Sequence, residues 1–189
     1  MNADRRAARD SGGPDSPGSR NPCHWFRSGK DAVDVTIRQY RRRDRSAVLE
    51  ITGRAFNGRC LECNVEERFG TVGGDRWQER KKSGIQYDLK HRPRDTLVAE
   101  VDGQVVGFVC TRLYRSRSIG HVANLAVAPE YQGQGIGRSL VEAALDHFRN
   151  HGMKHARVET LANNEKARGL YPKLDFEEVA RRIYYFREL

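Results

Sequence analysis

The sequence predicts an α+β fold with a mixed, mostly antiparallel central sheet flanked by helices. Two patterns lead to this class. Residues 96–113 contain two apolar runs on either side of Asp102-Gly103, a dipeptide typical of a two-residue hairpin turn. Residues 118–148 have the pattern of a strand, a glycine-rich loop and a helix, and a second strand and helix follow, which is typical of strand–helix–strand crossovers. The length of 189 residues suits one domain with a sizeable core.

The predicted elements begin with a strand and two helices before the hairpin. Residues 33–37 alternate in polarity like a strand. Asp44 can cap a helix that ends near Gly58. The apolar face of this helix consists of Val48, Ile51, Ala55 and Phe56. Residues 57–94 are less regular, and they hold one further predicted helix at 75–89.

The sequence pattern of the second half of the chain predicts, in order, a strand, a helix, a strand, a helix and a last strand. Residues 118–127 form the strand that leads into the glycine loop. The helix behind the loop ends at Gly152, a residue suited to a C-terminal cap. Its apolar face consists of Ile136, Leu140, Ala144, Leu145 and Phe148. Residues 156–160 predict a strand, a helix follows the asparagine pair 163–164, and residues 176–186 supply the last one or two strands.

Composition separates residues 1–32 from the predicted domain at 33–189. The first part is rich in Arg, Gly, Pro, Ser and Asp and nearly lacks apolar side chains, so we expect a disordered basic arm. Residues 1–45 hold 11 Lys or Arg against 6 Asp or Glu, which is over half of the net charge of +9. This charge favours an anionic partner, but no basic stripe with interleaved aromatic residues supports specific nucleic-acid binding. No apolar run predicts a membrane span or a secretion signal, and we expect a cytoplasmic protein.

The cysteines leave three interpretations open. Cys60-Leu61-Glu62-Cys63 is a single CxxC motif, and Cys110 stands alone in an apolar run. Cys23 and His24 could complete a zinc site with the motif, but no second motif of this kind supports one. A redox pair is the second alternative. We favour reduced structural thiols, and we expect no metal.

The stretch Gln132-Gly133-Gln134-Gly135-Ile136-Gly137 predicts an anion site. It joins an apolar strand to a helix, and free backbone N–H groups gather at a helix N-terminus. Glycines let several N–H groups point into one concavity and leave room for a diphosphate. A dinucleotide fingerprint or a P-loop that starts at Gly133 would need glycine where Arg138 stands, so neither motif fits.

From residue 118 to 186 the chain resembles the GNAT superfamily of acetyl-CoA-dependent N-acetyltransferases. Gln132, Gly135 and Gly137 meet the superfamily's acyl-CoA signature, and the preceding stretch 124–129 is similar to its pantetheine strand. The second match is Asn164-x-x-Ala167-x-x-Leu170-Tyr171-x-Lys173-x-Asp175-Phe176, which resembles the superfamily's second conserved helix.

Two residues depart from the superfamily's pattern in this second motif. Asp175 stands where glycine is usual, at a position that needs a left-handed cap, which Asp tolerates better than most residues. Pro172 lies within the helical pattern, so the helix should kink or end near it. Both departures affect the placement of Tyr171.

The resemblance implies a site for acetyl-CoA. The diphosphate would bind the loop residues Gln132, Gly133, Gln134, Gly135, Ile136, Gly137 and Arg138. The backbone N–H groups of Leu125, Ala126 and Val127 would hold the pantetheine arm and polarise the thioester carbonyl where the fourth and fifth strands diverge. Asn164 would cap its helix and also reach the pantetheine.

The resemblance also implies catalytic residues. Tyr171 would protonate the departing thiolate, since its hydroxyl has an ordinary pKa of about 10. His121 on the fourth strand and Glu159 on the fifth are both candidates for the base that deprotonates the amine, and bulk water is the third. Each of these side chains could instead have a purely structural role in packing or hydrogen bonding.

We therefore expect an N-acetyltransferase that moves an acetyl group from acetyl-CoA to a primary amine. The acceptor is a protein N-terminus, a lysine or a small-molecule amine. The alternative is a module that binds acyl-CoA as a sensor or docking domain without robust catalysis. Residues 57–94 would choose the acceptor, and they carry acidic side chains (Glu62, Glu66, Glu67) and basic ones (Arg80, Lys81, Lys82). No membrane partner is expected, and a homodimer stays open.

Overall fold

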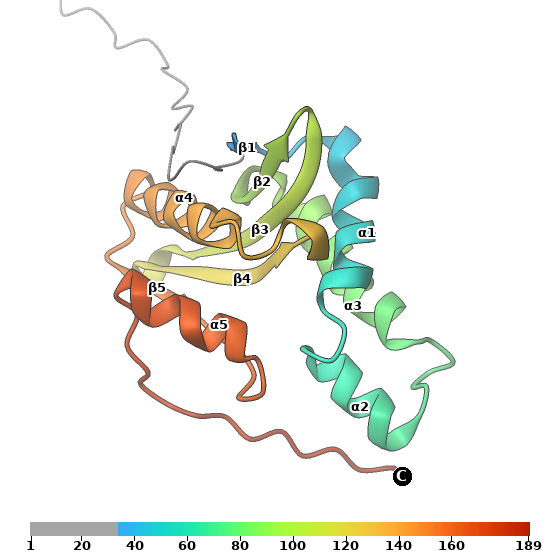
Figure 1. Cartoon of the computed structure of the whole chain (residues 1–189). Helices are drawn as coiled ribbons and strands as arrows, with labels where there is room; N and C mark the ends of the chain where they lie inside the picture. Colours follow the sequence, from blue (N-terminus) through green and yellow to red (C-terminus); the bar gives the residue numbers. More distant parts are fainter. Residues whose placement is uncertain (1–33) are drawn as a thin grey trace, which may run out of the picture.

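The computed structural model describes residues 34–189, so the arm predicted at 1–32 lies outside the described residues. Five strands form one sheet in the order β1-β2-β3-β4-β5 (Figure 1). The strands are β1 Thr36–Gln39, β2 Thr96–Val101, β3 Gln104–Tyr114, β4 Ile119–Val127 and β5 His155–Val158. The pairs β1–β2, β2–β3 and β3–β4 are antiparallel, and the pair β4–β5 is parallel. The predicted class, α+β with a mixed and mostly antiparallel sheet, is confirmed.

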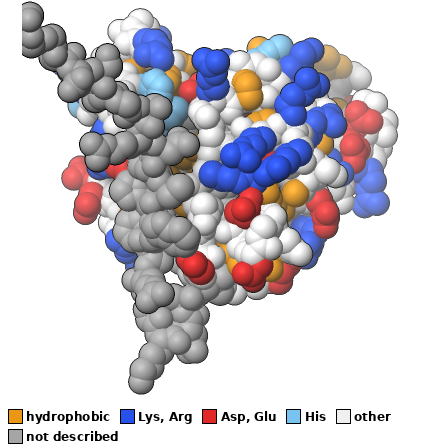
Figure 2. Space-filling view, turned by 90° about the horizontal axis from the view of Figure 1, so that it is seen from above, with side chains coloured by type: hydrophobic (Ala, Val, Ile, Leu, Met, Phe, Trp, Pro, Cys, Tyr) orange, Lys and Arg blue, Asp and Glu red, His pale blue; other side chains and the backbone are white. Residues whose placement is uncertain are grey.

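Helices cover both faces of the sheet (Figure 1). They are α1 Arg45–Ala55, α2 Leu61–Phe69, α3 Trp77–His91, α4 Ile136–Asn150 and α5 Glu165–Leu170. Helices α1 and α3 pack on one face and α4 packs on the other. Among residues 34–189, no helix is both long and apolar enough to cross a membrane. Seen from above, the surface carries basic and acidic side chains close together (Figure 2).

The core has two parts because successive side chains of a strand point to opposite faces. On β3, Phe108 contacts the cluster under α1 and α3, and its neighbour Val109 contacts the cluster under α4. Close packing of α4 requires a glycine on β4. A Cβ atom at Gly120 would lie 2.2 Å from the ring of Phe148, so any larger residue there would push α4 away.

The hairpin formed by β2 and β3 agrees with its prediction. Asp102 and Gly103 have φ angles of 48° and 78°, and this left-handed pair makes the tight turn that joins twisted antiparallel strands.

Asp44 precedes α1, but its carboxylate does not cap that helix. It accepts hydrogen bonds from the backbone N–H of Arg41 at 2.7 Å and from the guanidinium of Arg38 at 2.7 and 3.0 Å.

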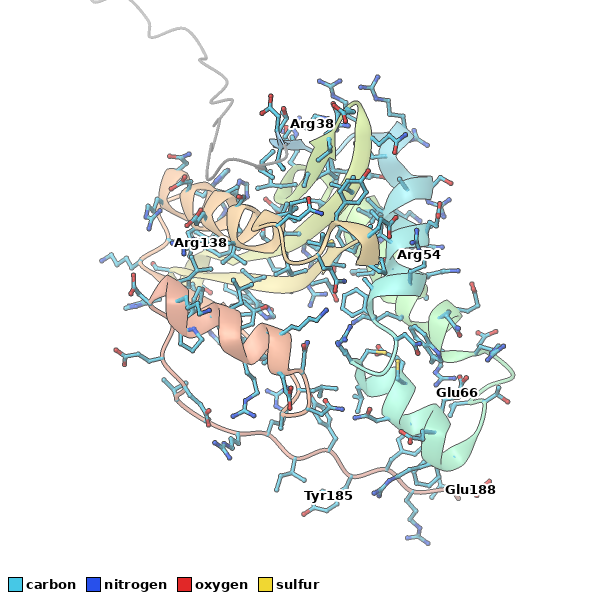
Figure 3. All side chains as sticks on the ribbon, in the orientation of Figure 1. Arg38, Arg54, Glu66, Arg138, Tyr185 and Glu188 are labelled. Atoms are coloured by element: carbon cyan, nitrogen blue, oxygen red, sulfur yellow. The ribbon has the colours of Figure 1, made fainter. Side chains whose placement is uncertain are left out.

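Two expectations about elements were wrong. Helix α2 was not predicted, although apolar residues at 61, 65 and 69 have the spacing of a helical face. The last strand, expected at 176–186, is absent, and the chain from residue 175 onward has no helix or strand. Strand β5 is only four residues long and offers little edge for pairing. The segment runs along the surface with Tyr185 exposed (Figure 3), while Phe186 contacts Phe69 of α2 at 5.0 Å between ring centroids.

Candidate active site

Strands β4 and β5 diverge at the centre of the molecule. They pair only over 119–122 and 155–158, and β4 then continues to Val127 without β5. A β-bulge marks the same place, because Cys110 pairs with Asn124 while Thr111 pairs with Val122, which leaves Ala123 as the extra residue. Along residues 123–127, the side of β4 away from β3 therefore has no strand partner. The divergence that the resemblance implied is present.

The glycine loop bends sharply between β4 and α4. Gly133 and Gly135 both have a φ of 84°, a conformation that is costly for any residue with a Cβ atom. Nothing lies within 4 Å of where a Cβ would be at either position, so the space beside the loop is open. The glycines are therefore required by the backbone conformation, and they leave room for a ligand.

The backbone N–H groups of this loop have no acceptor among the described residues. From residue 133 to 138, none of them donates a hydrogen bond within the described chain, and no side chain caps α4. The first helical bond is donated by Ser139 to the carbonyl of Gly135 at 3.1 Å. The first turn of α4 contains no acidic residue. These donors and the positive end of the helix dipole can therefore bind a diphosphate.

Side chains hold the loop in position. Gln132 donates from Nε2 to the carbonyl of Val127 at 2.9 Å, and its Oε1 accepts from Lys166 of α5 at 2.8 Å. Gln132 was expected to contact the cofactor, but both ends of its amide bind the protein. Arg138, at the first turn of α4 (Figure 3), forms an exposed ion pair with Glu142 at 2.8 Å. Such a pair is weak in water, so Arg138 can turn to an anion at little cost.

Helix α5 lies beside this loop. Asn164 caps it as predicted, accepting a hydrogen bond from the backbone N–H of Ala167 at 3.3 Å. The helix ends before Pro172 and continues as a 3-10 turn, 171–174, as the proline predicted. Asp175 then adopts the expected left-handed conformation with a φ of 59°.

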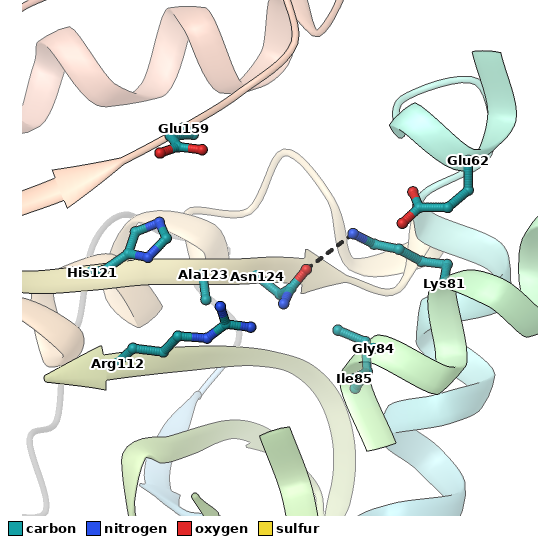
Figure 4. Close-up of a pocket in the computed structure, with 9 residues that line it drawn as sticks. All are labelled: Glu62, Lys81, Gly84, Ile85, Arg112, His121, Ala123, Asn124 and Glu159. Atoms are coloured by element: carbon teal, nitrogen blue, oxygen red, sulfur yellow. Dashed lines mark hydrogen bonds between the residues drawn. The ribbon is translucent and has the colours of Figure 1, made fainter. Parts of the chain in front are cut away.

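A cavity of about 290 Å³ lies where β4 and β5 diverge (Figure 4). Its lining comes from both faces of the opening: Glu62 of α2; Lys81, Gly84 and Ile85 of α3; Arg112 of β3; His121, Ala123 and Asn124 of β4; and Glu159 after β5. The extra residue of the β-bulge is thus part of the wall. The lining holds two cationic and two acidic side chains, so it suits a polar ligand.

A buried carboxylate, that of Asp88, holds side chains of the cavity lining in place. Asp88 of α3 is fully buried and accepts two hydrogen bonds from Arg112, at 3.2 and 3.0 Å, and one from Arg92 at 3.2 Å. Asn124 lies 3.5 Å from the same carboxylate, and its Oδ1 accepts from the Nζ of Lys81 at 3.1 Å (Figure 4). This network fixes the side chains on the floor of the cavity, because a buried charge must stay paired.

His121 and Glu159, the two candidates for the base, both line this cavity. The ring of His121 is buried, and its Nδ1 has no hydrogen-bond partner among the described residues. Burial and, to a smaller extent, the positive charge of Arg157 lower the pKa of His121 to about 4, although the carboxylate of Glu159 opposes this shift. His121 is therefore neutral at pH 7.

Glu159 is in a more open position. Its carboxylate is 44% exposed and forms ion pairs with Arg157 at 3.3 Å and Arg182 at 3.5 Å. Exposed pairs of this kind are worth little, so Glu159 is free to bind an amine or a water molecule.

Tyr171, the expected acid, does not line the cavity in this structure. It lies directly after α5, is buried, and packs edge-on against Phe176 with ring centroids 5.7 Å apart. Burial raises the pKa of its hydroxyl to about 12, so it stays protonated. Its neighbour Leu170 lies within 4 Å of a Cβ placed at Gly137, which locates this end of α5 beside the first turn of α4.

The charged residues of 57–94 divide between the cavity and the helices. Glu62 and Lys81 face the cavity. Glu66 instead accepts from the backbone N–H of Trp77 and pairs with Arg80 at 3.5 Å, which holds α2 to α3. Lys82 pairs with Glu79. Sequence reasoning missed Arg112, although a charged residue inside the apolar run of β3 was a usable signal.

The cysteine motif shows no metal site within the described residues, where no group of three or more His, Cys, Asp or Glu is placed to hold an ion. Cys23 and His24 lie outside the described residues.

Comparison with known proteins agrees with this geometry. The sequence model of the Acetyltransferase (GNAT) family matches residues 58–176. Among curated proteins, mycothiol acetyltransferase of Stackebrandtia nassauensis is 31% identical over 85% of this chain and 50% of its own length. The N-alpha-acetyltransferase 30 of Schizosaccharomyces pombe is 32% identical over 53% of this chain and 69% of its own length. This chain belongs to the Acetyltransferase (GNAT) family, and it spans only half of the mycothiol enzyme.

Solved structures show the same fold. The ribosomal-protein-S18-alanine N-acetyltransferase of Escherichia coli has a TM-score of 0.60 and 26% identity, with 80% of this chain and 83% of that chain covered. The PaiA N-acetyltransferase of Thermoplasma acidophilum, solved in complex with coenzyme A, has a TM-score of 0.59 and 19% identity over 74% and 87% of the two chains. Members of this family use acetyl-CoA.

Proposed function

We propose that this chain transfers an acetyl group from acetyl-CoA to a primary amine. The observation that carries the proposal is the pairing of two features at one opening of the sheet. One is the loop at 133–138, whose backbone N–H groups have no acceptor within the described chain. The other is the polar cavity at the divergence of β4 and β5.

The loop and β4 would bind the cofactor. A diphosphate on the N–H groups of the loop would place the pantetheine arm along residues 125–127 of β4, where β5 no longer pairs. The chemistry that acetyl-CoA supplies is a thioester with an electrophilic carbonyl carbon. Backbone N–H groups of β4 that point into the opening would polarise that carbonyl, as preorganised donors do in acyl transfer. The bulged residue just before this segment, Ala123, lines the cavity.

The cavity residues would bind and deprotonate the amine. His121 is neutral and has an unpartnered nitrogen, so it can accept the amine proton directly or through one water molecule. Glu159 would attract the ammonium form and stabilise the protonated imidazole. Tyr171 would return a proton to the thiolate, which requires its hydroxyl to turn from its packed position toward the opening. The products are an amide and free coenzyme A.

The lining supports a polar acceptor that carries an anionic or hydroxyl group besides its amine. Glu62 and Glu159 can hold an ammonium group, while Lys81 and Arg112 can hold a carboxylate or hydroxyls. The named relatives include a mycothiol acetyltransferase, an N-alpha-acetyltransferase and a ribosomal-protein-S18-alanine N-acetyltransferase. Both a peptide N-terminus and a small polar amine fit this description.

Release of free thiol from acetyl-CoA, measured with a panel of amines, tests the proposal. The panel should contain short peptides with free N-termini, the same peptides with blocked N-termini and a free lysine, an amino sugar and a simple alkylamine. We expect turnover with at least one polar amine and none with the alkylamine. If the protein binds acetyl-CoA in calorimetry yet releases thiol with no amine in the panel, it is an acyl-CoA-binding module instead. If it does not bind acetyl-CoA, the site itself is wrongly assigned.

A further inference from the structure

Two cysteines face one another at the start of α2. The sulfur atoms of Cys60 and Cys63 lie 2.6 Å apart. The Sγ of Cys60 also accepts the backbone N–H of Cys63 at 3.3 Å, so the first cysteine caps the helix. The thiol of Cys63 is within hydrogen-bond distance of the carbonyl of Phe56, at 3.3 Å. The fold thus holds both sulfur atoms side by side without help from a metal or from any other cysteine of the described chain.

The two thiols differ in access. Cys60 is buried, with 3% of its surface exposed, while Cys63 is only partly buried. Burial raises the pKa of the Cys60 thiol, and its hydrogen bond with Cys63 raises it further. Cys63 is therefore the sulfur that a reagent in solution reaches first, and Cys60 is the second sulfur, already within bonding reach.

The pair is linked to the cavity in two ways. Glu62, between the two cysteines, lines the cavity. Phe56, whose carbonyl is next to the Cys63 thiol, also places its ring 4.5 Å from the Nζ of Lys81, and that Nζ donates to Asn124 on β4. A new covalent bond between the sulfurs would break the Cys63–Phe56 contact. It would also tighten the first turn of α2, which carries Glu62.

We propose that Cys60 and Cys63 form a reversible disulfide that modifies the acceptor side of the cavity. The oxidant is a low-molecular-weight disulfide. The thiolate of Cys63 attacks one sulfur of that disulfide and releases the other as a thiolate. The sulfur of Cys60 then displaces the second small thiolate from Cys63. Cys60 and Cys63 lose two protons and two electrons in total, and the small disulfide is reduced to two thiols. The consequence for the acceptor rests on the acetyl transfer proposed above, whereas the formation of the bond does not.

Bond formation can be followed by mass spectrometry of the full chain after digestion. Trypsin cuts after Arg59 and Arg68, so the peptide 60–68 contains this cysteine pair and no other cysteine. The reduced protein is incubated with oxidised glutathione, free thiols are alkylated, and the protein is digested. We expect a peptide 60–68 that is unalkylated and two hydrogen atoms lighter than the dithiol, and that returns to the alkylated form after dithiothreitol. A peptide that is only alkylated, or that carries glutathione on Cys63, would overturn the proposal.

Matched variants separate this pair from the other cysteines. Cys63→Ser should lose the light peptide and any change of activity on oxidation. Cys110→Ala, which removes a buried cysteine of β3, should keep both. With the best amine of the panel, oxidation should change the KM for the amine at least about threefold and leave the affinity for acetyl-CoA unchanged. A disulfide without this kinetic change would refute the effect on the acceptor side. Absence of any turnover would refute the proposed function, and the peptide would still test the bond.

Discussion

The two halves of the site are built differently. The cofactor half, at residues 132–138, consists mainly of backbone: left-handed glycines, free N–H groups and the start of a helix. The acceptor half consists of side chains from α2, α3, β3, β4 and the end of β5. Backbone N–H groups can bind a diphosphate without a specific side chain, as long as glycines give the loop its shape. In the function proposed above, the side chains of the second half would decide which amine is used.

A negative charge in the glycine loop should abolish binding at the cofactor half and leave the acceptor half unchanged. Gly135→Glu forces a side chain onto a backbone with a φ of 84° and places a carboxylate among the N–H donors. We expect acetyl-CoA binding to be lost in calorimetry. Gly152→Glu is the matched control, because Gly152 has a φ of 73° and equally open surroundings at the opposite end of α4. Its backbone cost is similar, so affinity should be unchanged. Equal loss in both variants would mean that strain, and not the anion site, is responsible.

Removal of the Tyr171 hydroxyl tests whether this tyrosine, which directly follows α5, contributes to the chemistry. Tyr171→Phe keeps the ring that packs on Phe176, so stability should change little. Since general acid catalysis is worth ~10²–10⁴-fold, kcat should fall by about that factor. The KM for acetyl-CoA should move much less, because the hydroxyl acts mainly in the transition state. Unchanged kcat, with chemistry shown to be rate-limiting, would leave Tyr171 with a packing role.

Substitution of the two candidate bases should lower kcat/KM by different amounts. His121→Gln removes the neutral nitrogen in the cavity, and kcat/KM should fall about 10²-fold, as expected for a general base. Glu159→Gln removes a half-exposed charge and should cost about tenfold or less. Because Glu159 opposes the lowered pKa of His121, its loss should also shift the acid limb of the pH–rate profile to still lower pH. The reverse ranking of the two variants would make Glu159 the base.

The loop could be predicted from the sequence because its function depends on where glycines stand. Gly133 and Gly135 give the backbone its left-handed shape, and this shape leaves the N–H groups of the loop free to bind a ligand. The hairpin turn at Asp102-Gly103 was predictable for the same reason. The contact of Gln132 with the cofactor stays a prediction, and in this structure its amide binds the carbonyl of Val127 and the Nζ of Lys166.

The cavity could not be predicted in the same way. Arg112 and Asp88 are 24 positions apart and meet only because α3 packs on β3. The β-bulge at Ala123 leaves no mark in the sequence. The expected strand at 176–186 had a suitable pattern but needs an edge to pair with, and β5 ends after four residues. Local propensity decides such segments less than the partner that tertiary structure offers.

The smallest expected effect concerns the stability that the fold loses in acid because of His121. Its pKa is lowered to about 4 in the folded chain and is about 6.5 in an unfolded one. Between these values only the unfolded state binds the proton, so stability is full above pH 6.5 and is lost as the pH falls toward 4. Thermal unfolding of wild type and His121→Gln near pH 7.5 and near pH 5.5 measures this. From the higher to the lower pH, wild type should lose roughly 3–5 °C more in Tm than the variant. Burial also lowers the pKa of His147, but that residue is present in both proteins and cancels. Parallel losses in the two proteins would mean that the pKa of His121 is not lowered in the folded chain, which would contradict the burial of its ring in the cavity wall.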